Sequence, residues 1–261
     1  MGTTEPATDE SLAPAVREIL AAAENRGGAA SRTGETARLD VDATSLPDAL
    51  RDARTTARAP IIAEIKPTSP TAPYDRSIDP VATAEAMVAG GASAISVLTE
   101  PDHFGGSIEA LDAVRDAVSV PVLRKDFVLE PSQLDAVAAD AVLLIVRFLS
   151  DLEGMIEAAR DRGMTPLVET HTRDEVAEAV GAGADVIGVN NRDLATLTVD
   201  RSTVKQLAPL VPENVTLIAE SGIETPAHRE QMLAAGADGI LVGSAIMDGA
   251  IEENTGRLVE R

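Results

Sequence analysis

Short apolar runs recur along the chain from residue 61 onward and predict a regular alternation of strands and helices. In four places a glycine or another small residue separates an alanine-rich amphipathic segment from a β-branched run, as in GAGADVIGVN and AAGADGILVG. This order is typical of a helix that ends where a buried strand begins. Eight strands, 20 to 33 residues apart, are predicted to begin near residues 61, 94, 121, 141, 166, 186, 216 and 239.

Proline residues mark three of the predicted helix starts between these strands. Pro80, Pro131 and Pro226 precede VATAEAMVAG, SQLDAVAA and AHREQMLAAG, and proline is favoured in the first turn of a helix. Eight strand–helix units within about 200 residues predict an α/β fold, a parallel (βα)8 TIM barrel. The alternative is a doubly wound open sheet, which is disfavoured because no G-x-G-x-x-G turn follows the first strand.

Residues 1–58 precede the first predicted strand and indicate a helical N-terminal extension. Two helices are predicted, over SLAPAVREILAAAENR and LPDALRDARTTA, with a polar Gly/Ser/Thr link between them. We expect this extension to pack on the barrel, so that residues 1–261 form a single (βα)8 barrel domain.

The charge pattern bears on environment more than on activity. There are 43 acidic and 22 basic residues, which gives a formal net charge of −21 and disfavours binding to nucleic acid. The acids are scattered through the predicted helices, which favours a solvated surface suited to high salt over a site for a cationic partner. Only Lys66, Lys125 and Lys205 are lysines, and the other 19 basic residues are arginines. This composition resembles that of halophilic archaeal proteins. The negative charges of such a chain repel one another, and salt screens this repulsion, so we expect the fold to become less stable when salt is removed.

Several other classes are excluded by what the chain lacks. No apolar stretch reaches the roughly 18 residues of a membrane-spanning helix, and the N-terminal residues do not resemble a secretory signal. A cytoplasmic protein with no membrane partner is therefore expected. The absence of cysteine excludes disulfides and thiolate chemistry. His103, His171 and His228 form no ligand cluster with carboxylates along the chain, so no metal site is predicted.

Polar residues end the predicted strands, at the side of a (βα)8 barrel where active sites lie. Glu64 and Lys66 occupy alternate positions and therefore face the same side. Their burial would be costly unless they pair with each other or with a ligand. The other strand-end residues are Arg124, Lys125, Asp126, Glu169, Asn190, Asn191, Arg192, Glu220, Ser221, Gly243 and Ser244. Their convergence on one mouth predicts a functional site.

Paired glycine and serine residues follow the last two predicted strands, as Ser221–Gly222 and Gly243–Ser244. Barrels often bind phosphate at these loops through backbone N–H groups and a helix N-terminus, and glycine permits the close approach. The pattern therefore predicts a small phosphorylated substrate.

Seven motifs closely resemble, in sequence and in their order along the chain, those of the indole-3-glycerol-phosphate synthase family. They are AEIKPTSP, VLTEPDHFGGS, PVLRKDFV, PLVETHT, IGVNNRDL, IAESGI and LVGSAIM, and they span about residues 61–248. The resemblance implies a (βα)8 barrel with a helical extension over the site. It also implies a carbon–carbon lyase of tryptophan biosynthesis, which converts 1-(2-carboxyphenylamino)-1-deoxyribulose 5-phosphate to indole-3-glycerol phosphate with loss of CO2 and water.

The resemblance also implies roles for individual residues. Lys125 matches the general acid of ring closure, Glu169 the acid/base of dehydration, and Lys66 the lysine that holds the substrate carboxylate. Glu64, Asn190, Arg192 and Glu220 match residues that orient these groups. Substrate-binding roles fall to Ser69, to Phe104 and Phe127 around the aromatic ring, and to Ser221, Gly222, Gly243 and Ser244 around the phosphate.

The chemistry suits these residue types and requires no cofactor. A lysine can protonate or polarise the ketone that the electron-rich ring carbon attacks. The neighbouring nitrogen then accepts the electrons released as CO2 leaves. Burial and a second cation would lower the pKa of Lys125, while the surrounding glutamates would raise it, and the sequence leaves this direction open.

The sequence departs from the family pattern in two places, and three alternatives to the synthase function stay open. Pro67 and Thr68 replace an expected basic or polar pair, and the first 73 residues contain no aromatic residue, which leaves only aliphatic packing for the extension. The alternatives are another phosphosugar-binding barrel enzyme, either an isomerase or a Schiff-base aldolase with Lys125 as nucleophile, and a non-catalytic phosphosugar sensor. We expect a monomer.

Overall fold

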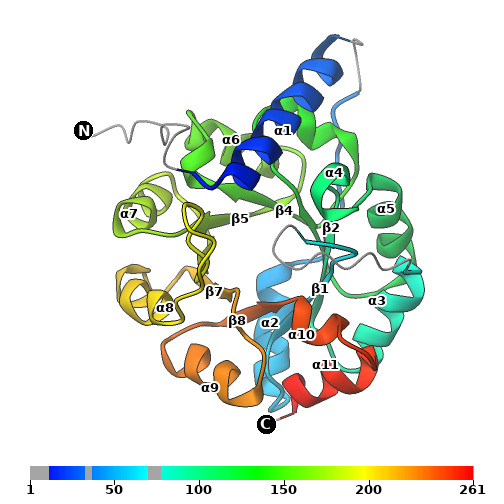
Figure 1. Ribbon diagram of the computed structural model, residues 1–261, viewed down its shortest axis with the longest axis vertical. Coiled ribbons are helices and arrows are strands. Elements are labelled where there is room, and N and C mark those ends of the chain that lie inside the picture. The colour runs from blue at the N-terminus through cyan, green and yellow to red at the C-terminus, as the bar shows by residue number, and fades with distance from the viewer. Residues whose placement is uncertain (1–11, 33–36, 70–77, 261) are drawn as a thin grey trace.

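Eight parallel strands close into a barrel in chain order, with β8 paired to β1 (Figure 1). The computed structural model describes residues 12–32, 37–69 and 78–260. The strands are β1 (Ile61–Ile65), β2 (Ala94–Leu98), β3 (Val122–Lys125), β4 (Ala141–Ile145), β5 (Thr165–Thr170), β6 (Val186–Asn190), β7 (Thr216–Glu220) and β8 (Gly239–Val242). Each begins within one residue of its predicted start. The predicted (βα)8 barrel is therefore confirmed.

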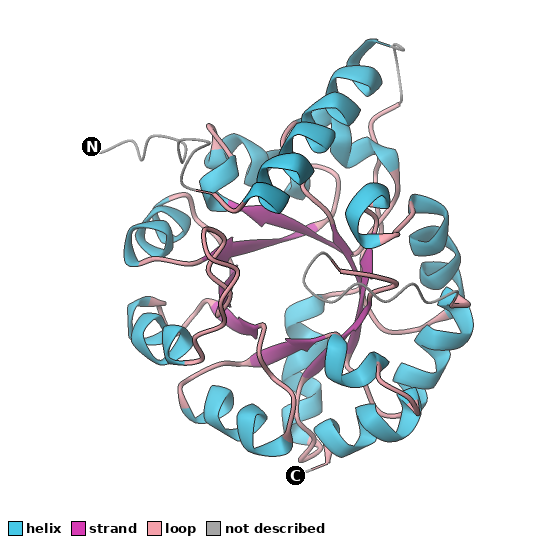
Figure 2. Cartoon of the chain, in the orientation of Figure 1, coloured by secondary structure: helices cyan, strands magenta, loops and turns pink. Residues whose placement is uncertain are grey.

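Helices surround the ring of strands (Figure 2). After the extension they are α3 (Pro80–Ala89), α4 (Pro101–Phe104), α5 (Ile108–Ala117), η2 (Pro131–Ala136), η3 (Val146–Phe148), α6 (Leu152–Arg160), α7 (Arg173–Gly181), α8 (Ser202–Leu207), η4 (Ala208–Leu210), α9 (Pro226–Ala234), α10 (Ser244–Met247) and α11 (Ile251–Val259). Asp79 and Thr225 cap α3 and α9 by accepting hydrogen bonds from first-turn N–H groups. The prolines that follow them occupy the first turn, as predicted.

The connection between β3 and β4 differs from the prediction. Pro131 begins the 3-10 helix η2, six residues long, instead of an α-helix. The extension helix α1 (Pro14–Arg32) packs against η2, and the Gln133 side chain donates a hydrogen bond to the Ala23 carbonyl (3.0 Å). The extension thus covers the part of the barrel where the outer layer lacks a long helix. Helix α1 also continues through part of the predicted Gly/Ser/Thr link.

The second extension helix, α2 (Leu46–Thr55), covers the interior of the barrel at its amino end. Leu46 and Leu50 are almost fully buried and belong to one apolar cluster with lumen residues such as Ile62, Leu123 and Ile218. Side chains of the barrel hold the segment that leads to α2, because Asp135 accepts from Leu39 N and Asp140 from Thr44 N, each at 3.0 Å. The extension therefore contacts both ends of the barrel.

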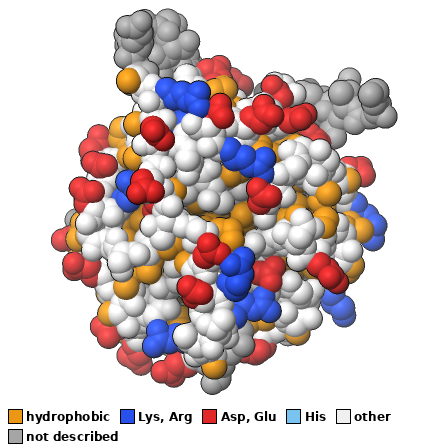
Figure 3. Space-filling model, turned by 180° about the vertical axis from the view of Figure 1, so that it is seen from behind, with side chains coloured by type: hydrophobic (Ala, Val, Ile, Leu, Met, Phe, Trp, Pro, Cys, Tyr) orange, Lys and Arg blue, Asp and Glu red, His pale blue; other side chains and the backbone are white. Residues whose placement is uncertain are grey.

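Acidic side chains are distributed around the face opposite to that of Figure 1, with fewer lysines and arginines between them (Figure 3). They do not gather into one block there, which agrees with the predicted solvated acidic surface. Among the described residues, no helix is both long enough and apolar enough to cross a membrane.

Candidate active site

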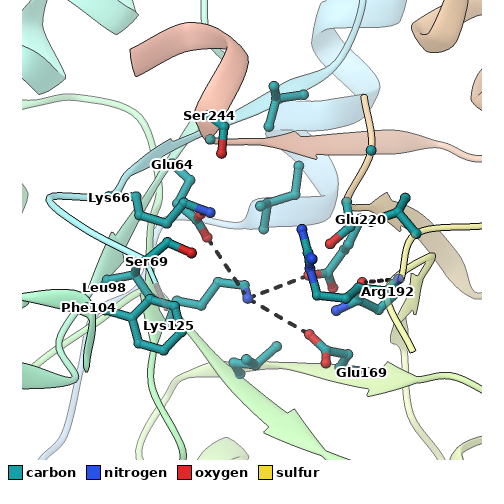
Figure 4. A pocket seen from close by; sticks show the side chains of 18 of the residues that line it. Glu64, Lys66, Ser69, Leu98, Phe104, Lys125, Glu169, Arg192, Glu220 and Ser244 are labelled. Carbon is teal, nitrogen blue, oxygen red and sulfur yellow. Dashed lines mark hydrogen bonds and ion pairs between the residues drawn. The ribbon is translucent and has the colours of Figure 1, made fainter. Parts of the chain in front are cut away.

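A cavity of about 260 Å³ opens at the carboxyl ends of the strands (Figure 4). The strand-end residues Arg124 and Asn191 do not line it, but every residue to which the family resemblance gives a role does. The residues with such a role are Glu64, Lys66, Ser69, Phe104, Lys125, Phe127, Glu169, Asn190, Arg192, Glu220, Ser221, Gly222, Gly243 and Ser244. The barrel brings them together because the carboxyl ends of all parallel strands meet at the same end.

Lys125 lies among three carboxylates that come from β1, β5 and β7 (Figure 4). Its Nζ is 3.9 Å from Glu64 Oε2, 3.9 Å from Glu169 Oε2 and 3.8 Å from Glu220 Oε2. Burial acts to lower the pKa of Lys125, but the three carboxylates outweigh it and raise the pKa above its ordinary value. Lys125 therefore carries a proton at neutral pH and can act as an acid.

Glu64 also pairs with the second lysine of the mouth. Lys66 Nζ lies 3.3 Å from Glu64 Oε1. The two side chains share one side of the chain at the end of β1, as their alternate spacing predicted. The buried carboxylate of Glu64 thus connects both lysines, which satisfies the pairing that its burial requires.

The two remaining carboxylates differ in their affinity for protons. Burial and the nearby charge of Glu169 raise the pKa of Glu220 to about 8. Burial also acts to raise the pKa of Glu169, but the contact with His171, whose Nε2 lies 3.3 Å from Oε1, and the charge of Lys125 outweigh it and lower the pKa to about 2. Glu169 is therefore ionised at neutral pH and can accept a proton, whereas Glu220 can hold one.

The raised pKa of Glu220 predicts how stability depends on pH. Its folded-state value of about 8 lies above the roughly 4.3 of an unfolded glutamate. The protonated form of Glu220 is therefore favoured by folding. Its contribution to the free energy of unfolding is fully present below the unfolded pKa and is lost as pH rises through about 8. Between pH 6 and 9 we expect the free energy of unfolding to fall by at least about 1 kcal/mol more in the wild type than in Glu220→Gln.

Urea denaturation at several pH values and constant molar KCl would measure this difference. Glu213→Gln is the matched control, because Glu213 is an exposed residue before β7. Equal pH dependence of unfolding in the wild type and Glu220→Gln would contradict the assignment of a raised pKa to Glu220.

The loops after β7 and β8 form another part of the cavity wall. Ser221 and Gly222 both have positive φ angles, 65° and 74°. At Gly222 a Cβ would lie 2.4 Å from Val199 Cγ1, and at Gly243 it would lie 2.6 Å from Glu64 Oε1. The positive φ and the close contact favour glycine at Gly222, and a side chain at Gly243 would displace the carboxylate of Glu64. Both glycines leave backbone groups accessible beside the cavity. The side chains of Ser221 and Ser244 add hydroxyl groups there.

Apolar side chains line the remaining wall. The chain's three phenylalanines form a row, with ring centroids of Phe104 and Phe127 6.4 Å apart and those of Phe127 and Phe148 6.0 Å apart. Phe104 and Phe127 reach the cavity, together with Val16 and Ile19 of α1. Among the described residues of the extension, those that line the cavity are aliphatic, in agreement with its lack of aromatic residues. This wall suits a planar apolar group.

The structure also shows an anchor for α1 that the sequence did not reveal. Arg26 of α1 pairs with Asp126 (3.1 Å) and with Glu100 (3.4 Å). Asp126 lines the cavity and also pairs with Arg124 (3.0 Å). Asp126 was recognised only as a strand-end residue, because nothing in local sequence links it to a residue 100 positions earlier.

In residues 12–32, 37–69 and 78–260, no group of three or more His, Asp or Glu side chains is placed to hold a metal ion.

Fold and cavity together define a (βα)8 barrel with paired ammonium and carboxylate groups at its mouth, a class suited to acid–base chemistry. The chain belongs to the indole-3-glycerol phosphate synthase family, because the family model of that description matches residues 10–258.

Individual relatives agree with this assignment. The chain is 60% identical to indole-3-glycerol phosphate synthase of Halobacterium salinarum over 250 residues, which cover 95% of this chain and 97% of the relative. It is 56% identical to the Haloarcula marismortui protein of the same name, over 95% of this chain and 93% of that one. Both relatives come from halophilic archaea, in agreement with the acidic composition.

Solved structures with more distant sequences share the fold. Thiamine phosphate pyrophosphorylase from Pyrococcus furiosus superposes with a TM-score of 0.61 at 20% identity, over 82% of this chain and 96% of that chain. N-acetylmannosamine-6-phosphate 2-epimerase from Clostridium perfringens gives a TM-score of 0.57 at 17% identity, over 82% and 94%. At these identities the likeness concerns the fold alone.

Proposed function

We propose that this chain converts 1-(2-carboxyphenylamino)-1-deoxyribulose 5-phosphate to indole-3-glycerol phosphate, as a carboxy-lyase of tryptophan biosynthesis. The observation that carries the proposal is the position of Lys125, held protonated among three carboxylates in a cavity that also contains a second lysine. Membership of the indole-3-glycerol phosphate synthase family supports the same conclusion.

Each end of the cavity suits one end of this substrate. The Ser221–Gly222 and Gly243–Ser244 turns would receive the phosphate through backbone N–H and hydroxyl groups. Lys66 would hold the carboxylate, and the wall around Phe104 and Phe127 would contact the aromatic ring. Binding at both ends would place the ketone between them, near Lys125.

Ring closure would be driven by Lys125. The ring carbon that bears the carboxylate attacks the ketone carbon, and the new carbon–carbon bond forms as Lys125 donates a proton to the ketone oxygen. CO2 then leaves, and the iminium-like nitrogen accepts the electron pair of the broken bond. The protein's own residues supply every proton transfer in this sequence.

Dehydration would complete the reaction. A lysine donates a proton to the departing hydroxide, and Glu169, which is ionised at rest, removes a proton from the carbon beside the nitrogen. The products are water and the aromatic indole ring. Glu64, Asn190, Arg192 and Glu220 would hold the reacting groups in place.

The test is formation of indole-3-glycerol phosphate and CO2 from the purified chain and this substrate at molar salt. We expect turnover without added metal or cofactor. Borohydride treatment in the presence of substrate should leave Lys125 unmodified. A reduced covalent adduct at Lys125 would indicate the Schiff-base aldolase instead, and binding of the substrate without turnover would indicate a phosphosugar sensor.

A further inference from the structure

A buried histidine lies directly behind Glu169 and outside the cavity. His171 follows the last residue of β5, and its side chain is only 4% exposed. Its Nε2 is 3.3 Å from Glu169 Oε1, and its Nδ1 is 3.3 Å from Glu175 Oε2. The imidazole thus lies between two carboxylates, one of which faces Lys125.

The second carboxylate is itself fixed. Glu175 belongs to α7, where Thr172 caps the helix and accepts a hydrogen bond from Glu175 N. Arg147 of η3 contacts Glu175 Oε1 through Nε (2.9 Å) and Nη2 (2.7 Å). The backbone N–H of His171 donates to Glu175 Oε2 (2.5 Å). Arg147, Glu175, His171 and Glu169 therefore form one buried chain that leads from the outer layer to the cavity.

We propose that His171 is a positioning residue for Glu169. As a doubly protonated imidazole, His171 binds Oε1 of the Glu169 carboxylate and leaves Oε2 directed toward Lys125. This inference rests on the proposed function, in which Glu169 is the base of dehydration. His171 is absent from the cavity lining, so it would act through Glu169 without contacting the substrate.

The chemistry of imidazole explains why this position suits histidine. Only a ring that carries protons on both nitrogens can donate to two carboxylates at once. Burial acts to lower the pKa of His171, but Glu169 and Glu175 outweigh burial and the charge of Arg147, and they raise the pKa to about 9. The ring therefore stays charged across the neutral range.

The contact with His171 orients the carboxylate of Glu169 and favours its ionised form. Its other neighbours are Lys125 of β3, Asn190 of β6 and Glu220 of β7. Among the groups that lower the pKa of Glu169, His171 has the largest effect. Without His171, only Lys125 and Asn190 would oppose burial, so the pKa of Glu169 would rise toward the protonated form, which cannot accept a proton.

Two substitutions separate the two sides of the imidazole. In His171→Gln the amide nitrogen can take the place of Nε2 and reach Glu169, whereas in His171→Asn it can take the place of Nδ1 and reach only Glu175. We expect His171→Asn to lower kcat by roughly 10- to 100-fold with little change in KM. His171→Gln should retain more activity than His171→Asn. His228→Asn, on α9, is the matched control.

The pH profile of kcat distinguishes positioning from a structural role. In His171→Asn the acid limb should move upward by about one pH unit or more, because Glu169 becomes easier to protonate. A merely structural histidine would lower the melting temperature without moving this limb. Wild-type kcat and an unmoved acid limb in folded His171→Asn would overturn the inference.

An independent measurement needs no substrate. The chain contains three histidines, so the ring resonances of His171 can be assigned in 13C- and 15N-labelled protein by comparison with His171→Asn. We expect the His171 ring to remain doubly protonated through pH 8. Titration of that ring near the ordinary value of about 6.5 would overturn the inference. A wild-type chain that makes no indole product but keeps the charged ring would instead count against the proposed function.

Discussion

Replacement of Lys125 by alanine is expected to lower kcat at least about 10²-fold while the fold is retained. Lys125 is the only residue whose cationic group lies within 4 Å of Glu64, Glu169 and Glu220 among the ion pairs of the described chain. Its removal would take away the proposed proton donor for the ketone. It would also leave three carboxylates close together without their shared cation.

Two further variants show whether the loss reflects chemistry. Lys125→Met keeps an apolar side chain of similar length, which guards against a variant that fails to fold. Lys125→Arg keeps the charge but replaces the compact ammonium with a larger planar guanidinium, which cannot take the same position among the three carboxylates, so it should also be strongly impaired. Lys205→Ala, at an exposed position of α8, is the matched control. Steady-state kinetics with circular dichroism would measure both properties, and turnover by folded Lys125→Met within about threefold of wild type would exclude the assigned role.

Replacement of Glu169 by glutamine should produce a loss of similar size, at least about 10²-fold in kcat. Glutamine has nearly the same shape and can still hydrogen-bond, but it cannot take up and release a proton. Because Glu169 is ionised at neutral pH, the substitution removes the proposed base of dehydration. KM should change much less than kcat, since the residue acts in a chemical step.

A measurement of product and stability together would test this expectation. If dehydration becomes slow, CO2 release should exceed indole formation during the first turnovers of Glu169→Gln. Equal amounts of both products at wild-type rates, in a folded variant, would show that Glu169 does not serve as the base. Glu213→Gln again provides a surface control for the loss of one negative charge.

The barrel could be predicted from sequence because its signal is local and repeated. Runs such as Ala94–Leu98 and Val186–Asn190 are fully buried strands, and the small residues before them mark helix ends. The helix predicted after Glu130 was wrong in type, because η2 is a short 3-10 helix against which α1 packs. That contact joins parts of the chain more than 100 residues apart, as in Ala23 and Gln133.

The residues that line the candidate site could be predicted from the sequence, but the directions of their pKa shifts could not. Parallel strands bring their carboxyl ends together whatever the loops do, so a polar residue such as Lys125 or Glu169 at a strand end must face the mouth or its rim. The sequence offered only a weak signal for His171, its position two residues after Glu169. It offered none for the partners of His171 in α7 and η3.

Periodicity and strand-end chemistry depend on neighbours along the chain, and from these the (βα)8 fold, the family resemblance and the residues of the mouth follow. The pKa directions of Lys125, Glu169 and Glu220 depend on distances of 3.8 to 3.9 Å between side chains from separate strands. Arg26, which anchors α1, pairs with Asp126 in the same long-range way. Such interactions vary with separation and burial, so they are defined only once the barrel has closed.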